Sequence, residues 1–207
     1  MKRSATIDHR LERMTFFSDA VFAISITLLI LELRVPEGLG LATNQRWLEV
    51  LAELVWRFNA FLLSFLVIGA LWVSHHMLFS LLHNFNRRIL WPNLLLLLTV
   101  TVIPFTTTLL AKGSLSPIPY AAYSAVLLAA GLFKVHLTRF ALMPELVSSG
   151  VRPGRIALEL RRRWILPLAA LAGLILAFPF PAWNNLAMLI LPIGLRLPGL
   201  RYTVDDQ

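Results

Sequence analysis

Three stretches of this 207-residue sequence contain no Asp, Glu, Lys or Arg, and each is long enough to cross a membrane as a helix. They run from Phe58 to Asn86, from Ile89 to Ala111 and from Gly113 to Phe133. Since about 20 apolar residues span the hydrocarbon core of a bilayer, each stretch predicts a transmembrane helix. Charged residues make up only 14% of the chain, against about a quarter of a soluble domain. We therefore expect an all-α integral membrane protein.

Two further regions predict the remaining spans. An apolar segment with charges only near its ends precedes the three stretches, and it ends in Leu-Glu-Leu-Arg-Val-Pro without a signal-peptide cleavage site. The uncharged run from Trp164 to Leu195 is too long for one crossing, and the turn-forming residues from Pro179 to Asn185 divide it. We expect one membrane domain over residues 1–207 with six spans. The expected spans are residues 16–35, 58–82, 89–111, 115–137, 164–179 and 183–198.

The basic residues predict the orientation of these spans. With the N-terminus inside, fourteen Lys and Arg residues fall on the cytoplasmic side and four on the outer side. Because basic residues accumulate in cytoplasmic loops, both termini are expected in the cytoplasm of a multi-pass cell-membrane protein. This topology also accounts for the net charge of +8, so no nucleic-acid partner is expected.

One carboxylate lies at membrane depth. Asp19 stands about one turn inside the first predicted span, where a charge is costly and a partner is expected. The cytoplasmic half of the second span has the same depth and carries Trp72, His75 and His76, with Trp72 and His76 four residues apart on one face. With Arg13, these groups predict a structural polar cluster joined by hydrogen bonds. A solvated surface carboxylate and a proton relay through Asp19 and His76 are the alternatives.

Other chemistry has little support in the sequence. Adjacent residues on a helix point about 100° apart, so His75 and His76 do not converge on a metal ion. The chain has no Cys, no GxSxG motif and no Walker lysine. We therefore expect that the protein is not an enzyme and that it holds neither a metal ion nor a cofactor.

The first span also carries an apolar stripe. Ile24, Leu28 and Leu31 follow the spacing i, i+4 and i+7, and Thr27 lies beside them. By pattern alone, ordinary packing between helices explains such a stripe.

The polar and apolar features of the first span together form a familiar motif. Arg13-Met-Thr-Phe-Phe17-Ser18-Asp19, or RxxxFSD, resembles the signature of the transmembrane protein 175 family of potassium channels. The similarity continues in Leu71-Trp72-Val-Ser-His75-His76, in Trp91-Pro-Asn93 and in Ile103-Pro104-Phe105, and it covers roughly residues 10–110.

The resemblance implies a potassium-permeable channel: a homotetramer whose first helix lines a central pore without a re-entrant selectivity loop. The permeant ion is K+, and the surroundings are the lipid bilayer. Carried onto this chain, the pore constriction and lining are Ile24, Thr27, Leu28 and Leu31, with Ile24 as the narrowest ring. The structural network behind the pore is Arg13, Phe17, Ser18, Asp19, Trp72 and His76. A proton-coupled secondary transporter using Asp19 and His76, and a non-conducting membrane scaffold, are the other hypotheses.

Overall fold

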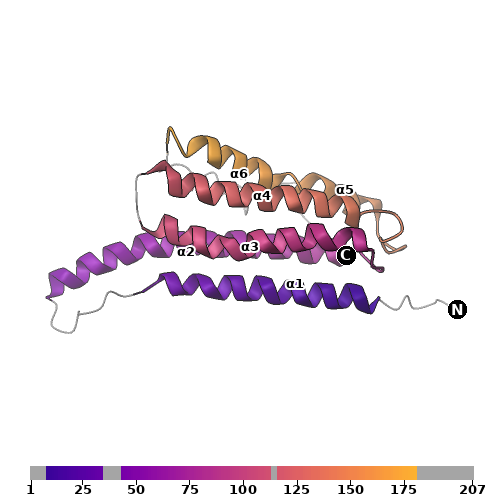
Figure 1. The fold of residues 1–207 in the computed structure, drawn as a ribbon, viewed down its shortest axis with the longest axis horizontal. Coiled ribbons are helices and arrows are strands. Elements are labelled where there is room, and N and C mark those ends of the chain that lie inside the picture. Colours follow the sequence, from indigo (N-terminus) through magenta and orange to yellow (C-terminus); the bar gives the residue numbers. More distant parts are fainter. Residues whose placement is uncertain (1–7, 35–42, 113–115, 181–207) are drawn as a thin grey trace.

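The computed structural model describes residues 8–34, 43–112 and 116–180, and these residues form a bundle of helices (Figure 1). Four of the helices in these ranges are long and apolar enough to cross a membrane, which confirms an all-helical membrane fold. The helices are α1 (His9–Leu28), which continues as the 3-10 helix η1 (Leu29–Glu32), α2 (Asn44–Phe79), the 3-10 helix η3 (Arg87–Ile89), α3 (Leu90–Ala111), α4 (Pro117–Ala141), α5 (Pro153–Arg162) and α6 (Ile165–Leu176).

Helix α2 is much longer than the span predicted at residues 58–82. It begins at Asn44, where the side chain of Thr43 caps it by accepting a hydrogen bond from the backbone N–H of Arg46. No Gly or Pro interrupts the chain between residues 44 and 58, so the helix continues. Its 36 residues extend about 54 Å at 1.5 Å per residue, against about 30 Å of hydrocarbon core. The first part of α2 accordingly projects beyond the other helices (Figure 1).

Only one of the last two predicted spans lies within the described residues. Helix α6 occupies Ile165–Leu176 within the span predicted at 164–179, but its 12 residues are too few to cross a bilayer alone. The span predicted at 183–198 lies outside the described residues.

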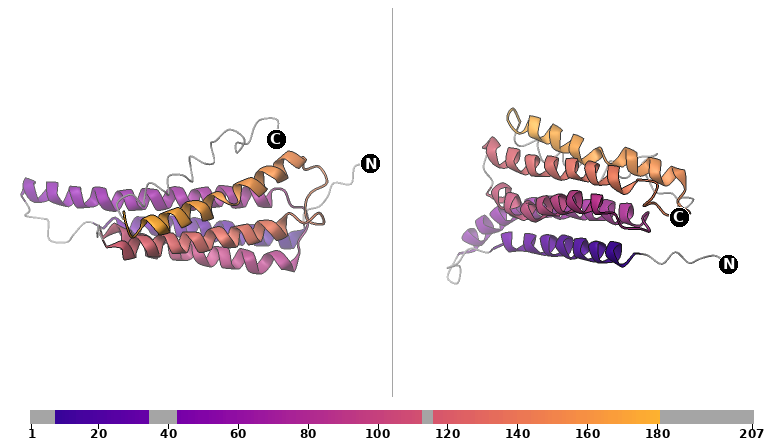
Figure 2. Two further views of the ribbon diagram at one scale, coloured as in Figure 1. Left: turned by 90° about the horizontal axis from the view of Figure 1, so that it is seen from above. Right: turned by 45° about the vertical axis from the view of Figure 1, so that its right-hand side comes forward.

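The helices pack in successive layers. Helix α1 packs on α2 and α3, α3 packs on α4, and α4 packs on α6 (Figures 1 and 2). The two connections at one end of the bundle are also paired. The backbone N–H of His83 donates to Leu146, and that of Ser148 donates to Leu81, which ties the α2–α3 connection to the chain between α4 and α5.

The contact between α4 and α6 depends on a missing side chain. A Cβ atom on Gly131 would lie 2.7 Å from the backbone nitrogen of Pro167, closer than real carbon contacts. Gly131 therefore allows the two backbones to approach each other.

Substituting Gly131→Ala should destabilise the protein by about 1–3 kcal/mol, because the backbone of Pro167 has to move. Thermal unfolding in detergent measures the effect. Gly69→Ala is the matched control, since nothing lies within 4 Å of the added carbon on α2; it should be neutral or slightly stabilising. Equal melting temperatures for the two variants would contradict the close packing of α4 on α6.

Candidate functional site

Helix α1 has two different faces. Leu11, Ser18, Phe22 and Leu29 are buried against the neighbouring helices, and Leu29 has no exposed surface at all. The predicted pore-lining residues lie on the opposite face. Ile24 is 59% exposed, Leu28 44% and Leu31 52%.

Thr27 lies on the same exposed face. Its hydroxyl donates a hydrogen bond to the backbone carbonyl of Ile24 at 2.9 Å. The hydroxyl proton is thus directed into the helix, while the oxygen keeps lone pairs that can accept from water or contact a cation.

The predicted polar cluster is partly assembled at one edge of α1. The indole Nε1 of Trp72 donates to the Asp19 carboxylate at 2.9 Å, a bond between α1 and α2. The ring of His76 lies beside that of Trp72, with 5.6 Å between the ring centres. Asp19, Trp72 and His76 therefore lie together, and Trp72 is the residue that contacts both of the others.

Arg13 and Phe17 do not share in these contacts. Both side chains are exposed on α1, and in the part of the chain that the structure describes Arg13 makes no hydrogen bond or ion pair. On a helix, residues 13, 17, 24 and 31 project within about 40° of one another. In a single subunit Arg13 and Phe17 therefore extend the face of Ile24 and do not lie behind it.

Behind α1 lies a buried network that joins three helices. The side-chain amide of Asn93 on α3 donates to the Ser18 hydroxyl at 2.9 Å, and its oxygen accepts from Nε2 of His75 on α2 at 2.8 Å. The Ser18 hydroxyl in turn donates to the backbone carbonyl of Met14 at 2.8 Å. Ser18, His75 and Asn93 are completely buried. The ring of His75 also stacks on that of Phe79, with 4.2 Å between their centres.

The histidine in this buried network is His75, whereas the sequence pattern placed His76 in the predicted network. The helical spacing of residues on α2 distinguishes the two histidines. His75 continues the series of Val67, Leu71 and Leu78, which recur every three or four residues and form the buried face of α2. His76 falls outside that face and is exposed.

A second chain of buried hydroxyls joins α2, α3 and α4. Thr107 donates to Ser64 at 2.7 Å, and Ser64 donates to the hydroxyl of Tyr123 at 3.1 Å. All three are buried to below 1% exposure. The sequence does not distinguish them in advance, since single hydroxyl residues are common in apolar spans.

The described residues hold no group of three or more His, Cys, Asp or Glu side chains placed to bind a metal ion. The chemistry that this region offers is therefore an exposed apolar face backed by buried hydrogen bonds.

Comparison with protein families identifies the same part of the chain. Residues 13–104 match the model of the family described as endosomal/lysosomal potassium channel TMEM175. This segment contains the exposed stripe, the Asp19–Trp72 bond and the buried Asn93 network. The family resemblance indicated by the RxxxFSD motif is confirmed.

Three relatives have the following similarity to this chain. A potassium channel of Streptomyces collinus is 39% identical over 140 residues, which cover 61% of this chain and 64% of that protein. A potassium channel of Chamaesiphon minutus is 40% identical over 125 residues, which cover 56% of this chain and 59% of that protein. The human endosomal/lysosomal proton channel TMEM175 is 25% identical over 143 residues, which cover 68% of this chain and 28% of that protein. The matches thus span less than two thirds of each relative.

A solved structure extends the similarity to the fold. The crystal structure of a lysosomal potassium-selective channel TMEM175 homolog from Chamaesiphon minutus aligns with a TM-score of 0.79 and 28% sequence identity. The alignment covers 91% of this chain and 98% of the other. The two chains share their overall helical arrangement.

Replacing Asn93 tests the buried network. Asn93→Leu leaves the Ser18 hydroxyl and the His75 ring without this partner, and each stranded buried group costs about 1–3 kcal/mol. We expect a clearly lower melting temperature in detergent. The control is Asn59→Leu, because Asn59 is exposed and, among the described residues, bonds only the carbonyl of Val55 in its own helix. Its effect should stay within about 0.5 kcal/mol. A stable Asn93→Leu protein would mean that the network does not hold α1 in place.

Proposed function

Because residues 13–104 belong to the TMEM175 family, we propose that this chain is one subunit of a potassium-permeable cation channel whose pore is lined by α1. The family is one of ion channels and not of enzymes. The bacterial relatives described above are named potassium channels, which supports K+ as the permeant ion.

The observation that carries the proposal is the exposed apolar stripe on α1. In a single subunit Ile24, Leu28 and Leu31 face away from the bundle, although the opposite face of the same helix is buried and hydrogen-bonded. One stripe cannot enclose a pore, so several copies have to surround an axis. We propose a homotetramer with four α1 helices at its centre.

In this arrangement Ile24 forms the narrowest ring, and Leu28 and Leu31 form further apolar layers. An apolar neck closes a pore by excluding water and conducts when it widens and becomes hydrated. The Thr27 hydroxyls offer oxygen atoms next to the ring. We expect no cofactor, and the permeant ion in this proposal is K+.

The groups behind α1 have a structural role in this proposal. The Asn93 bonds and the Trp72–Asp19 bond attach α1 to α2 and α3, so that its pore face keeps its direction. His76 supports the Trp72 ring.

The membrane topology completes the proposal. The subunit has six spans in the cell membrane, with the fifth at residues 164–179, the sixth at 183–198 and both termini in the cytoplasm. The excess of basic residues on the side of the N-terminus supports this orientation.

Proton conduction is the second candidate, because the vertebrate relatives are named proton channels. Purified protein in liposomes separates the candidates. A potassium channel dissipates a K+ gradient without a coupled ion, a proton channel acidifies the lumen under a voltage alone, and a coupled transporter requires both ions.

The assembly is tested by mass. Native mass spectrometry in detergent or nanodiscs should give four copies of the 23.3 kDa chain. A monomer that still conducts K+ would exclude a pore between α1 helices.

The constriction is tested by Ile24→Asn. Four amides at the ring keep water in the neck, so K+ flux per assembled tetramer should rise and the closed state should leak. Leu29→Asn is the control on the buried face of the same helix region. It should impair assembly without increasing flux, because it places an amide in an apolar core.

Equal flux in the wild type and Ile24→Asn would disprove a constriction at Ile24. A larger gain from Leu29→Asn would assign the pore to the other face of α1.

A further inference from the structure

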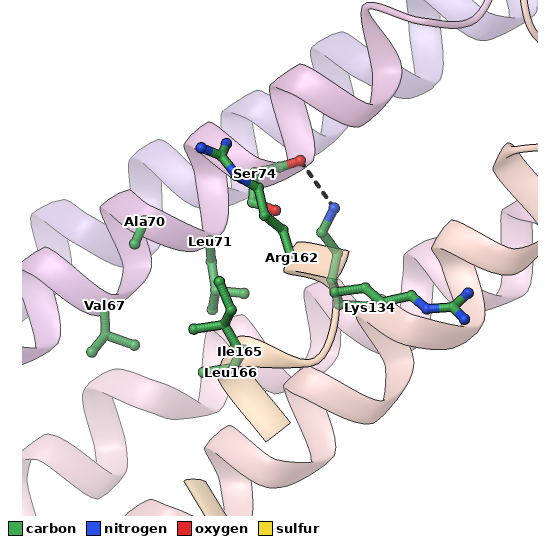
Figure 3. Close-up of a pocket in the computed structure, with 9 residues that line it drawn as sticks. Val67, Ala70, Leu71, Ser74, Lys134, Arg162, Ile165 and Leu166 are labelled. Carbon is green, nitrogen blue, oxygen red and sulfur yellow. Dashed lines mark hydrogen bonds between the residues drawn. The ribbon is translucent and has the colours of Figure 1, made fainter. Parts of the chain in front are cut away.

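A cleft lies where α2, α4 and the junction between α5 and α6 meet (Figure 3). Its cavity volume is about 30 Å³, and about 390 Å³ when the open space at its mouth is counted. None of the residues that line the cleft lies on α1, which carries the exposed stripe. It is therefore separate from the proposed pore.

One side of the cleft is cationic. Lys134 on α4 is only 3% exposed, and its ammonium group donates to the backbone carbonyl of Ser74 on α2 at 2.9 Å (Figure 3). Arg162 and Arg163 also line the cleft. The buried carboxylate of Glu159 interacts electrostatically with Lys134. Three cations and one carboxylate make a net charge of +2 at this site.

Arg163 has unused hydrogen-bonding capacity among the described residues. Its Nε atom is buried and has no hydrogen-bond partner among the described residues. A buried donor without a partner is uncommon, because leaving one unpaired is costly. An anionic acceptor reaches this atom when the side chain moves, because the Nε atom is not accessible to solvent as it stands.

The other side of the cleft is apolar. Its walls consist of Val67, Ala70, Leu71, Ile165 and Leu166. A small soluble anion makes no favourable contact with such a surface, whereas a hydrocarbon chain does. An occupant that matches both sides carries a negative group joined to an apolar segment.

The flanking residues are typical of the level of lipid headgroups. Trp164, directly after Arg163, is 44% exposed, and the Arg163 guanidinium carbon lies 5.8 Å from the centre of its ring. Tryptophan accumulates at membrane–water interfaces. The basic run Arg161 to Arg163 covers the last turn of helix α5 and its C-cap, and such clusters attract anionic lipids.

We propose that this cleft binds one anionic phospholipid. Arg163, with Arg162 and Lys134 beside it, holds the headgroup phosphate, and an acyl chain lies against the apolar wall. The lipid contacts α2, α4 and the junction between α5 and α6.

Native mass spectrometry of the full-length protein tests the proposal. Delipidated protein in neutral detergent is titrated with phosphatidylglycerol, with phosphatidylcholine, and with inorganic phosphate as competitor. Arg163→Gln should weaken phosphatidylglycerol binding about tenfold, as expected for the loss of one charge-assisted hydrogen bond. Arg161→Gln is the matched control, because Arg161 is exposed and does not line the cleft; its binding should remain within about twofold.

Two further variants separate the contribution of charge from that of the apolar wall. Arg163→Lys keeps the charge and should retain most of the affinity for phosphatidylglycerol. The melting temperature of each variant in phosphatidylcholine alone verifies that the variant is folded. Leu166→Ser should weaken phosphatidylglycerol binding, because it replaces an apolar side chain of the cleft wall by a polar one.

Three results would overturn the proposal. Equal losses in Arg163→Gln and Arg161→Gln would indicate diffuse surface attraction. Equal binding of phosphatidylcholine and phosphatidylglycerol would remove the role of charge. Displacement of the lipid by millimolar inorganic phosphate would identify a free anion as the occupant. Because binding and not flux is measured, these results are independent of whether the protein conducts K+.

Discussion

The side-chain amide of Asn93 controls how α1 is rotated about its own axis. It bonds Ser18 on α1 and His75 on α2 in a region that is completely buried. Turning α1 by one residue, about 100°, would break the bond to Ser18 and leave polar groups unpaired in an apolar surrounding. With Ser18 facing inward, Ile24 has to face outward. The buried network and the exposed stripe are two consequences of one constraint.

Helix α2 connects this constraint to the rest of the subunit. Within a single turn, Trp72 and His75 bond residues of α1 and α3, while Ser74 accepts from Lys134 of α4 in the basic cleft. The cleft and the hydrogen bonds that hold α1 therefore involve the same turn of α2.

Much of the fold was predictable from the sequence because long uncharged segments have few alternatives to transmembrane helices. The third predicted span, 89–111, corresponds closely to α3 at Leu90–Ala111. The start of α2 was not predictable in this way. Its first turns project beyond the bundle and carry charged residues, so hydropathy does not distinguish them from a loop. Helix capping at Thr43 and the absence of breakers decided where that helix begins.

The candidate site also has features that the sequence predicts and features that only the tertiary structure decides. The sequence by itself predicted a partner for Asp19 and placed Trp72 at the same depth, since a carboxylate inside a span is costly without a partner. It also determined which residues form the apolar stripe, because helical periodicity alone places Ile24 and Leu31 on one face. Only the tertiary structure decided between His75 and His76, and between the two faces of α1. Those choices depend on how α2 and α3 are rotated against α1, and rotation follows from packing and hydrogen bonds among residues far apart in the chain.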